Sequence, residues 1–173
     1  MSLHIIIDGY NLIRQSGQLS LLDLQDIQLG REALVDLLAA YKKFKAHRIT
    51  VVFDGTGSPL FSRQRDRQKG ITIVYSRNGE SADEVIKKMA RQEGPKALVV
   101  SSDQDIVRSA ASWGSATISA REFEGRLVEA RLLDGTGMEA EDQKGWTPTT
   151  KKKGPRRRLP KKQRKNRAKV GKL

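Results

Sequence analysis

The chain has 173 residues, a formal net charge of +13 and no cysteine, which favours a single domain and excludes disulfides, zinc–thiolate sites and thiol nucleophiles. No segment approaches the roughly 18 apolar residues of a membrane span, and an apolar run already starts at Leu3, leaving no room for a signal peptide, so we expect a cytoplasmic protein that does not enter a membrane. The charge is uneven: residues 144–173 hold nine Lys, five Arg and no acid and carry +14, whereas residues 1–143 hold 19 basic and 20 acidic residues.

Apolar runs and helical spacings alternate along residues 1–143. In chain order they predict a strand over 3–8, a helix over 29–44, strands over 48–54 and 71–76, a helix over 82–92, a strand over 96–102, a helix over 104–113, a short strand over 116–119 and a helix over 121–133. This alternation predicts an α/β fold with right-handed crossovers and a central parallel sheet. Residues 55–70 lie between two strands and are predicted to form a long loop, a kind that is often functional or mobile.

The end of the chain has a composition of its own. In residues 144–173 Pro, Gly, Lys and Arg dominate, and apolar residues are too sparse to form a core. We therefore expect a folded domain over 1–143, followed by a disordered or extended basic tail over 144–173. Such a tail would bind RNA phosphates with a steep salt dependence, although a merely solubilising tail is an alternative. The residues expected to contact RNA there are Lys151, Lys152, Lys153, Arg156, Arg157, Arg158, Lys161, Lys162 and Arg164.

Acidic residues follow the predicted strands. Asp8 ends the first apolar run, Asp54 ends the second strand, and Asp103 follows the strand over 96–102. The carboxyl ends of parallel strands line the crevice in which such sheets bind ligands. Carboxylates gathered there repel one another unless a hard cation lies between them. Because all candidate ligands are oxygens, Mg²⁺ or Mn²⁺ suits the site better than zinc.

Three further residues belong to this candidate site, and two of them have a structural alternative. Asp83 lies in the first turn of the helix over 82–92, and Asp105 lies just after Asp103. Asn11 follows the Asp8-Gly9 pair and could direct its amide at a phosphate or a metal-bound water. The alternative for Asp8 and Asn11 is that they only form a turn. The alternative for Asp103 and Asp105 is helix capping, with Asp103 at the N-cap and Asp105 in the first turn. Glu84 is expected to form a capping box with Ser81.

Two features near the acids suggest contacts with RNA. Tyr10 lies two residues after Asp8 and could stack on a base, which is worth about 1–3 kcal/mol, or could pack in the core. Arg63, Arg65 and Arg67 stand at every second position of the predicted loop. An extended backbone would place these three on one face, where they could guide RNA, whereas a solvated loop is the alternative.

The motifs at 7–11, 52–55, 81–84 and 100–105 resemble the NYN domain family, relatives of the PIN-like ribonucleases, and in particular its YacP-like bacterial branch. The resemblance implies a PIN-like three-layer α/β sandwich with an acidic Mg²⁺ or Mn²⁺ pocket. It implies endoribonuclease activity, in some members on RNA linked to translation. By match, Asp8, Asp83 and Asp103 take the metal-ligand roles, with Asp105 and Asn11 beside them. The basic tail lies outside the matched motifs.

The leading hypothesis is a metal-dependent endoribonuclease in which water attacks phosphorus and the ion neutralises the developing charge. The partner would be RNA, with ribosomal RNA as one candidate that charge alone does not identify. One alternative is a catalytically inactive RNA- or ribosome-binding module that keeps a relic of the pocket. A weaker alternative is a phosphohydrolase of small phosphates, which the Asp103-x-Asp105 spacing suggests.

Overall fold

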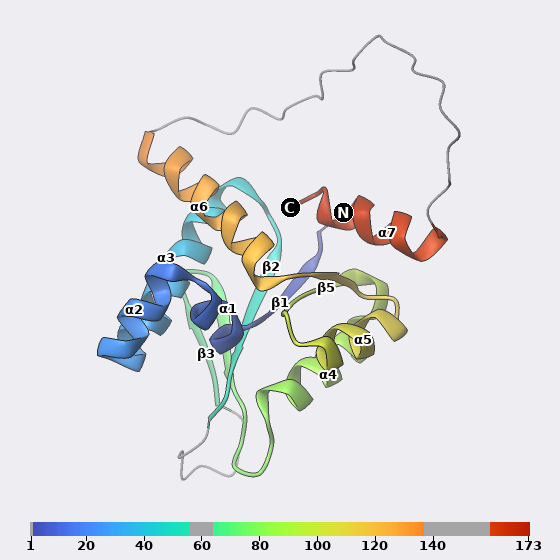
Figure 1. The fold of residues 1–173 in the computed structure, drawn as a ribbon, viewed down its shortest axis with the longest axis horizontal. Coiled ribbons are helices and arrows are strands. Elements are labelled where there is room, and N and C mark those ends of the chain that lie inside the picture. Colours follow the sequence, from blue (N-terminus) through green and yellow to red (C-terminus); the bar gives the residue numbers. More distant parts are fainter. Residues whose placement is uncertain (1, 56–63, 137–159) are drawn as a thin grey trace.

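The chain forms one six-stranded sheet, seen in a computed structural model that describes residues 2–55, 64–136 and 160–173 (Figure 1). The strands lie in the order β3-β4-β2-β1-β5-β6, and every neighbouring pair is parallel except β3 with β4. Their bounds are β1 His4–Asp8, β2 Arg48–Phe53, β3 Gln64–Gln68, β4 Ile71–Tyr75, β5 Ala97–Val100 and β6 Ala116–Ile118. The predicted parallel α/β sheet is confirmed.

Helices cover both faces of this sheet, as Figure 1 shows. Their bounds are α1 Gly9–Gln15, α2 Gly17–Gln25, α3 Ile27–Phe44, α4 Ala82–Glu93, α5 Gln104–Ser112, α6 Ala120–Thr136 and α7 Lys161–Val170, with a 3-10 turn at Gly94–Lys96. None of the helices in the described ranges is long and apolar enough to cross a membrane.

The alternation of side chains along β1 separates two hydrophobic cores. Ile5 and Ile7 point toward α1, α2, α3 and α6, whereas Ile6 points toward α4 and α5. All three are fully buried, as expected for a central strand of a parallel sheet that is covered on both faces. The molecule is therefore a three-layer sandwich, as the resemblance implied.

Two short helices between β1 and α3 were not predicted. Ser16 ends α1 and begins α2, because its hydroxyl accepts the Leu19 N–H at 3.2 Å. Helix α2 has only one buried residue, Leu19, while Leu21 and Leu24 are 63% and 83% exposed. Its apolar residues therefore do not form one stripe, and the periodicity that reveals an amphipathic helix is missing.

The prediction of a loop over 55–70 is wrong for its second half. Residues 64–68 form the edge strand β3, which pairs antiparallel with β4 through a tight turn at Lys69 and Gly70. All of its side chains are exposed and polar, so the alternating apolar pattern of a half-buried strand is absent. Backbone hydrogen bonds to β4, and not burial, define this strand.

The expectation of a disordered or extended tail is wrong for residues 161–170, which form helix α7. The Asn166 amide pairs with the backbone of Thr117 on edge strand β6, accepting its N–H at 2.7 Å and donating to its carbonyl at 3.1 Å. Beyond the helix, Leu173 is buried against the core, and the Tyr41 hydroxyl donates to its carbonyl at 3.2 Å. The end of the tail is thus part of the folded body, while the expected boundary at 143/144 lies outside the described residues.

Candidate active site

Asp8 lies at the carboxyl end of the central strand β1, between β2 and β5. Only 9% of the residue is exposed. Its carboxylate accepts the Asn11 N–H at 3.3 Å, which caps α1, and the Ser101 hydroxyl at 3.2 Å. The turn-forming role that was an alternative for Asp8 is therefore real, but this cap places a carboxylate at the middle of the sheet edge.

The charges around Asp8 oppose its ionisation. The pKa of Asp8 is raised from its ordinary value of 3.8 to about 6, mainly by burial and to a smaller extent by the negative charges of Asp83 and Asp103, against the two hydrogen bonds that lower it. A carboxyl whose pKa responds to two others in this way shares an electrostatic environment with them. The carboxylates of Asp8, Asp83 and Asp103 thus act on one another.

Asp103 occupies the N-cap of α5, as its structural alternative predicted. One carboxylate oxygen accepts the N–H groups of Asp105 and Ile106 at 2.7 and 3.3 Å. The Asp103 N–H in turn donates to the Ser101 hydroxyl at 3.1 Å, and this hydroxyl donates to Asp8. Ser101 is therefore a bridge between the two acids, which sequence reasoning missed although it lies in the motif at 100–105.

Asp83 lies in the first turn of α4, next to a complete capping box. Ser81 and Glu84 make both hydrogen bonds of the box, so the structural role predicted for Glu84 is confirmed. Burial raises the pKa of Asp83, and Asp103 raises it further, whereas Lys87 lowers it. Asp83 has no part in the box, so its carboxylate is left for the acidic site.

Asp105 differs from the other acids because it forms an ion pair. The Lys87 ammonium donates to its carboxylate, and this contact raises the pKa of Lys87. The carboxylate is largely exposed. This arrangement favours a structural role for Asp105 at the start of α5, and it places the cation Lys87 beside the acids, a neighbour that no sequence motif indicated.

Asn11 connects helix α1 to the loop before α5. Its side-chain oxygen accepts the Ser102 N–H at 3.0 Å, and Gln15 Nε2 donates to the same oxygen at 3.4 Å. This oxygen therefore fixes the strand ends of β1 and β5 relative to each other. The predicted contact of Asn11 with a phosphate or water would involve its NH₂ group.

Tyr10 packs against aromatic and cationic side chains on the α3 side of the sheet. Its ring centroid lies 5.1 Å from that of Phe53, and its hydroxyl accepts two N–H groups of Arg31. Both Arg31 and Arg14 lie against its ring, at 5.4 and 5.7 Å from the centroid. The packing alternative for Tyr10 thus holds, and Arg31 is a functional candidate that lay outside every recognised motif.

Comparison with known proteins identifies the family. The family model of the YacP-like NYN domain matches residues 5–170. The chain belongs to this family. The matched range includes helix α7. The four sequence motifs had left this part of the chain outside the resemblance.

Known relatives agree with this membership. The chain is 28% identical over 87 residues to an uncharacterized YacP protein of Bacillus subtilis, a match that spans about half of each chain, 50% and 51%. The crystal structure of Rae1 (YacP) from the same organism has a TM-score of 0.63 with 25% identity, over 79% of both chains. The crystal structure of a mutant of that protein has the same TM-score with 24% identity, over 78% of this chain and 80% of the mutant's.

The donor set of this NYN domain fits a hard cation in its chemistry. Asp8, Asp83 and Asp103 offer only oxygen atoms, which Mg²⁺ and Mn²⁺ prefer, and their mutual repulsion is of the kind that a cation relieves. Within the described residues, however, no three acidic or histidine side chains are arranged as a ready-made metal site. The three carboxylates therefore influence each other's ionisation, but their oxygens are not arranged as a preformed coordination sphere.

The basic residues predicted to bind RNA lie in different parts of the NYN domain. Arg65 and Arg67 are exposed on β3. Lys161, Lys162 and Arg164 are exposed on α7, which lies near the start of β1 and not near its acidic end (Figure 1). The remaining predicted contacts lie outside the described residues: Arg63, Lys151, Lys152, Lys153, Arg156, Arg157 and Arg158.

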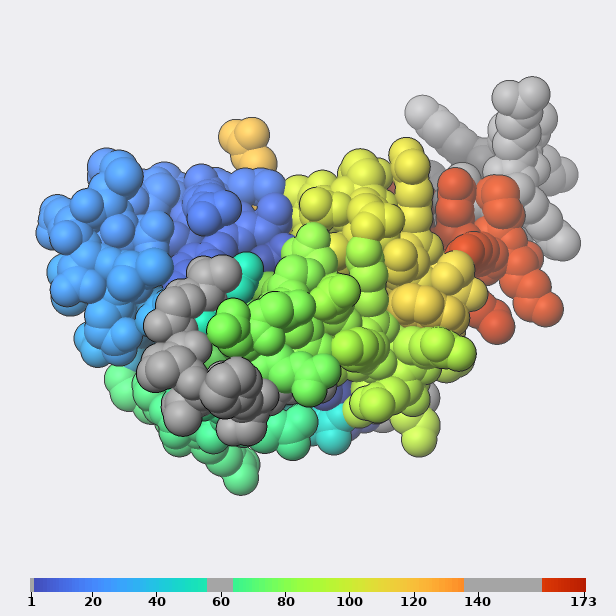
Figure 2. Space-filling view, turned by 90° about the horizontal axis from the view of Figure 1, so that it is seen from below, coloured from blue at the N-terminus to red at the C-terminus, as the bar shows by residue number. Residues whose placement is uncertain are grey.

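Figure 2 shows the face on which α1 and α2 (blue), α4 (green) and α5 (yellow) come together, with α7 (red) far to one side. The helix starts that carry Asp83 and Asp103 belong to α4 and α5. By contrast, Lys169 on α7 donates to the carbonyl of Gly114 at 3.2 Å and to that of Pro95, which lies just before strand β5 begins. Helix α7 therefore borders the amino ends of the strands, and the acids border the carboxyl ends.

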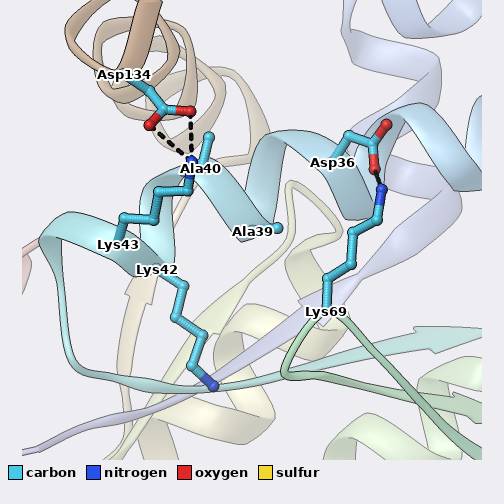
Figure 3. Close-up of a pocket in the computed structure, with 7 residues that line it drawn as sticks. All are labelled: Asp36, Ala39, Ala40, Lys42, Lys43, Lys69 and Asp134. Atoms are coloured by element: carbon cyan, nitrogen blue, oxygen red, sulfur yellow. Dashed lines mark hydrogen bonds and ion pairs between the residues drawn. The ribbon is translucent and has the colours of Figure 1, made fainter. Parts of the chain in front are cut away.

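Two hollows of the surface lie apart from the acids. One, of about 510 Å³, lies between α3, α6 and the β3–β4 turn, and its ion pairs join Lys43 to Asp134 and Lys69 to Asp36 (Figure 3). A larger one, of about 1420 Å³, lies between α7 and the loops at the amino ends of the strands. None of the predicted acidic residues lines either hollow, so neither is the predicted active site.

Proposed function

We propose that this NYN domain is a metal-dependent endoribonuclease that hydrolyses RNA phosphodiesters with Mg²⁺ or Mn²⁺. One observation carries the proposal: Asp8 lies buried at the carboxyl end of the central strand, joined to the Asp103 backbone through the Ser101 hydroxyl, and its ionisation is opposed first by burial and then by Asp83 and Asp103. Asp8 and Asp103 also cap α1 and α5, but the repulsion of like charges in a partly buried site is unfavourable and capping alone does not require it. Membership of the YacP-like NYN family supports the same conclusion.

Asp8, Asp83 and Asp103 would hold the ion, which supplies charge neutralisation at the phosphate and a more acidic water. The chain's own contribution is to keep these carboxylates oriented. Ser101 fixes one oxygen of Asp8 by donating to it at 3.2 Å. The N–H groups at the start of α5 fix one oxygen of Asp103, so the second oxygen of Asp103 is left for a ligand.

Cleavage of a labelled single-stranded RNA by wild type and by Asp8→Asn tests the proposal. We expect Mg²⁺ or Mn²⁺ to support cleavage, EDTA to abolish it, and Asp8→Asn to lower the rate about 10²-fold or more, the scale of losing one group that stabilises transition-state charge. Glu84→Gln is the matched control, because it removes an acid from the same helix turn as Asp83 while glutamine preserves the capping box. Wild-type cleavage by a folded Asp8→Asn protein would exclude this mechanism.

A second function, that of a catalytically inactive RNA-binding module, is favoured by a separate observation. The acids of the described residues are not arranged as a ready-made metal site, while the exposed face of α7 is strongly basic. This alternative expects RNA binding that survives Asp8→Asn and no cleavage with either metal. The same assay therefore separates the two functions. Association with translation-linked or ribosomal RNA stays a prediction of the family resemblance.

A further inference from the structure

An arginine lies among three aromatic rings beside the acidic edge. The guanidinium carbon of Arg31 is 5.4 Å from the ring centroids of Tyr10 and Phe53 and 5.3 Å from that of Tyr75. Its Nε donates to the Tyr10 hydroxyl at 2.9 Å. A second cation, Arg14, lies 5.7 Å from the Tyr10 ring, so the two arginines share one aromatic ring.

Neither of these two cations is neutralised by an acidic partner. In the described part of the chain neither Arg14 nor Arg31 forms an ion pair. The pKa of Tyr10 is raised mainly by burial and to a smaller extent by the charge of Asp23, whose buried Oδ1 makes no hydrogen bond. Aromatic rings stabilise a guanidinium through their faces without neutralising it. The N–H groups that Tyr10 does not use therefore stay available to an anion.

The arginine cluster borders the same end of the sheet as the acids, but on the other face. Phe53 and Tyr75 are the last residues of β2 and β4 and pack in the core beneath α3, whereas Asp83 and Asp103 begin α4 and α5 on the opposite side. Asp8 lies between the two groups, at the end of β1.

Gly9 fixes the spacing between the two groups. It lies between Asp8 and Tyr10 and packs so closely on the Phe53 ring that a Cβ atom at this position would overlap it. The backbone therefore turns directly over the Phe53 ring. As a result Tyr10, which contacts Arg14 and Arg31, lies only two residues after Asp8.

We propose that Arg14 and Arg31 form a subsite for an RNA phosphate next to the scissile one. This inference rests on the proposed ribonuclease function. A polyanion that approaches several carboxylates requires cations close by, and the planar guanidinium binds phosphate oxygens with two parallel N–H groups. Tyr10 acts here as a positioning residue whose ring and hydroxyl hold the arginines, which replaces the predicted stacking of Tyr10 on a base.

RNA binding measured in EDTA tests the subsite without any cleavage. Fluorescence anisotropy with a short single-stranded RNA at several salt concentrations compares the wild type, Arg14→Gln and Arg31→Met, with Arg131→Gln on α6 as the matched control for loss of one exposed arginine. Each subsite variant should raise Kd about threefold to tenfold and reduce the log–log salt slope by about 0.7, the value for one phosphate contact to a single strand. The control should do neither.

Arg14 is exposed and touches the cluster only at the Tyr10 ring, 5.7 Å from the centroid, so Arg14→Gln keeps the test decisive even if Arg31→Met unfolds. A Kd and salt slope of Arg14→Gln equal to those of the Arg131→Gln control would overturn the subsite. A cleavage assay separates this failure from that of the nuclease. If Asp8→Asn abolishes cleavage while both arginine variants bind as wild type, only the subsite is wrong. If the variants lose binding but no RNA is cut with either metal, the arginines bind an RNA phosphate, but the nuclease is wrong and there is no scissile phosphate beside them.

Discussion

The two ends of the sheet are built on opposite principles. At the carboxyl end, Asp8, Asp83 and Asp103 repel one another, and burial opposes the ionisation of Asp8. On the side of the amino end, Lys169 of α7 donates to backbone carbonyls of the loops there, and Asn166 pairs with Thr117 in the middle of edge strand β6. The five residues of β1 separate these ends, a length of about 16 Å.

The contrast separates function from stability. The amino end contains paired groups, and its exposed lysines and arginines remain in water, where like charges interact weakly. At the carboxyl end, the partly buried carboxylates of Asp8, Asp83 and Asp103 repel one another, which lowers stability until a cation binds between them. We therefore expect Asp8→Asn at the acidic end to stabilise the free protein at neutral pH and substitutions at the α7 anchor to destabilise it.

The largest effect is expected from Asp8→Asn on stability. Because the pKa of Asp8 is raised to about 6 in the fold, the folded chain keeps a proton between about pH 4 and 6 that the unfolded chain has released. Wild type should therefore lose stability relative to Asp8→Asn as the pH rises through this range, by on the order of 3 kcal/mol. Urea unfolding at about pH 4 and about pH 7.5 measures this difference.

Addition of Mg²⁺ sharpens the same comparison. If Asp8 is a ligand, the ion should stabilise the wild type at about pH 7.5 and leave Asp8→Asn almost unchanged, because only a ligand that binds the folded state shifts its stability.

Each of the two predictions for Asp8 has an outcome that contradicts it. In the absence of Mg²⁺, an equal free energy of unfolding for wild type and Asp8→Asn at both pH values would contradict the raised pKa. Equal stabilisation of both by Mg²⁺ would contradict Asp8 as a ligand.

At the other end, Asn166→Ala should lower the free energy of unfolding by about 1–2 kcal/mol. It removes two hydrogen bonds and leaves the partly buried N–H and carbonyl of Thr117 without their partners. Urea unfolding measures the loss, and amide hydrogen exchange should be faster at Thr117. Gln163→Ala, an exposed residue of the same helix, is the control; exchange at Thr117 as slow as in wild type would show that this anchor does not hold α7.

The smallest effect on stability is expected when Lys161, Lys162 and Arg164 are all replaced by Gln. These side chains are exposed, so the free energy of unfolding should change by no more than about 0.5 kcal/mol. If they bind RNA, the salt slope of binding should fall by about 0.7 for each phosphate that is no longer neutralised. If the triple variant binds RNA with the affinity and the salt slope of the wild type, α7 is not part of the RNA-binding surface.

Local sequence patterns determined the parallel strands of this protein, one helix cap and the grouping of acids at one edge of the sheet. The β-branched runs predicted the parallel strands, because a strand buried on both faces needs apolar residues at every position. The capping box of Ser81 and Glu84 was also readable, since its partners lie three residues apart. The aspartates at strand ends could be grouped because all parallel strands end at the same edge of the sheet.

Tertiary structure alone decided which distant groups meet. Nothing in a polar, basic segment indicates that Asn166 will complete the edge of β6, 49 residues earlier in the chain, or that β3 will form on the edge of β4. The same holds for Arg31, which stands among aromatic rings supplied by three separate elements. Hydrogen bonds and ring contacts of this kind depend on which surfaces the packing of the two hydrophobic cores brings together. Local periodicity does not predict them, because it describes only neighbours in the sequence.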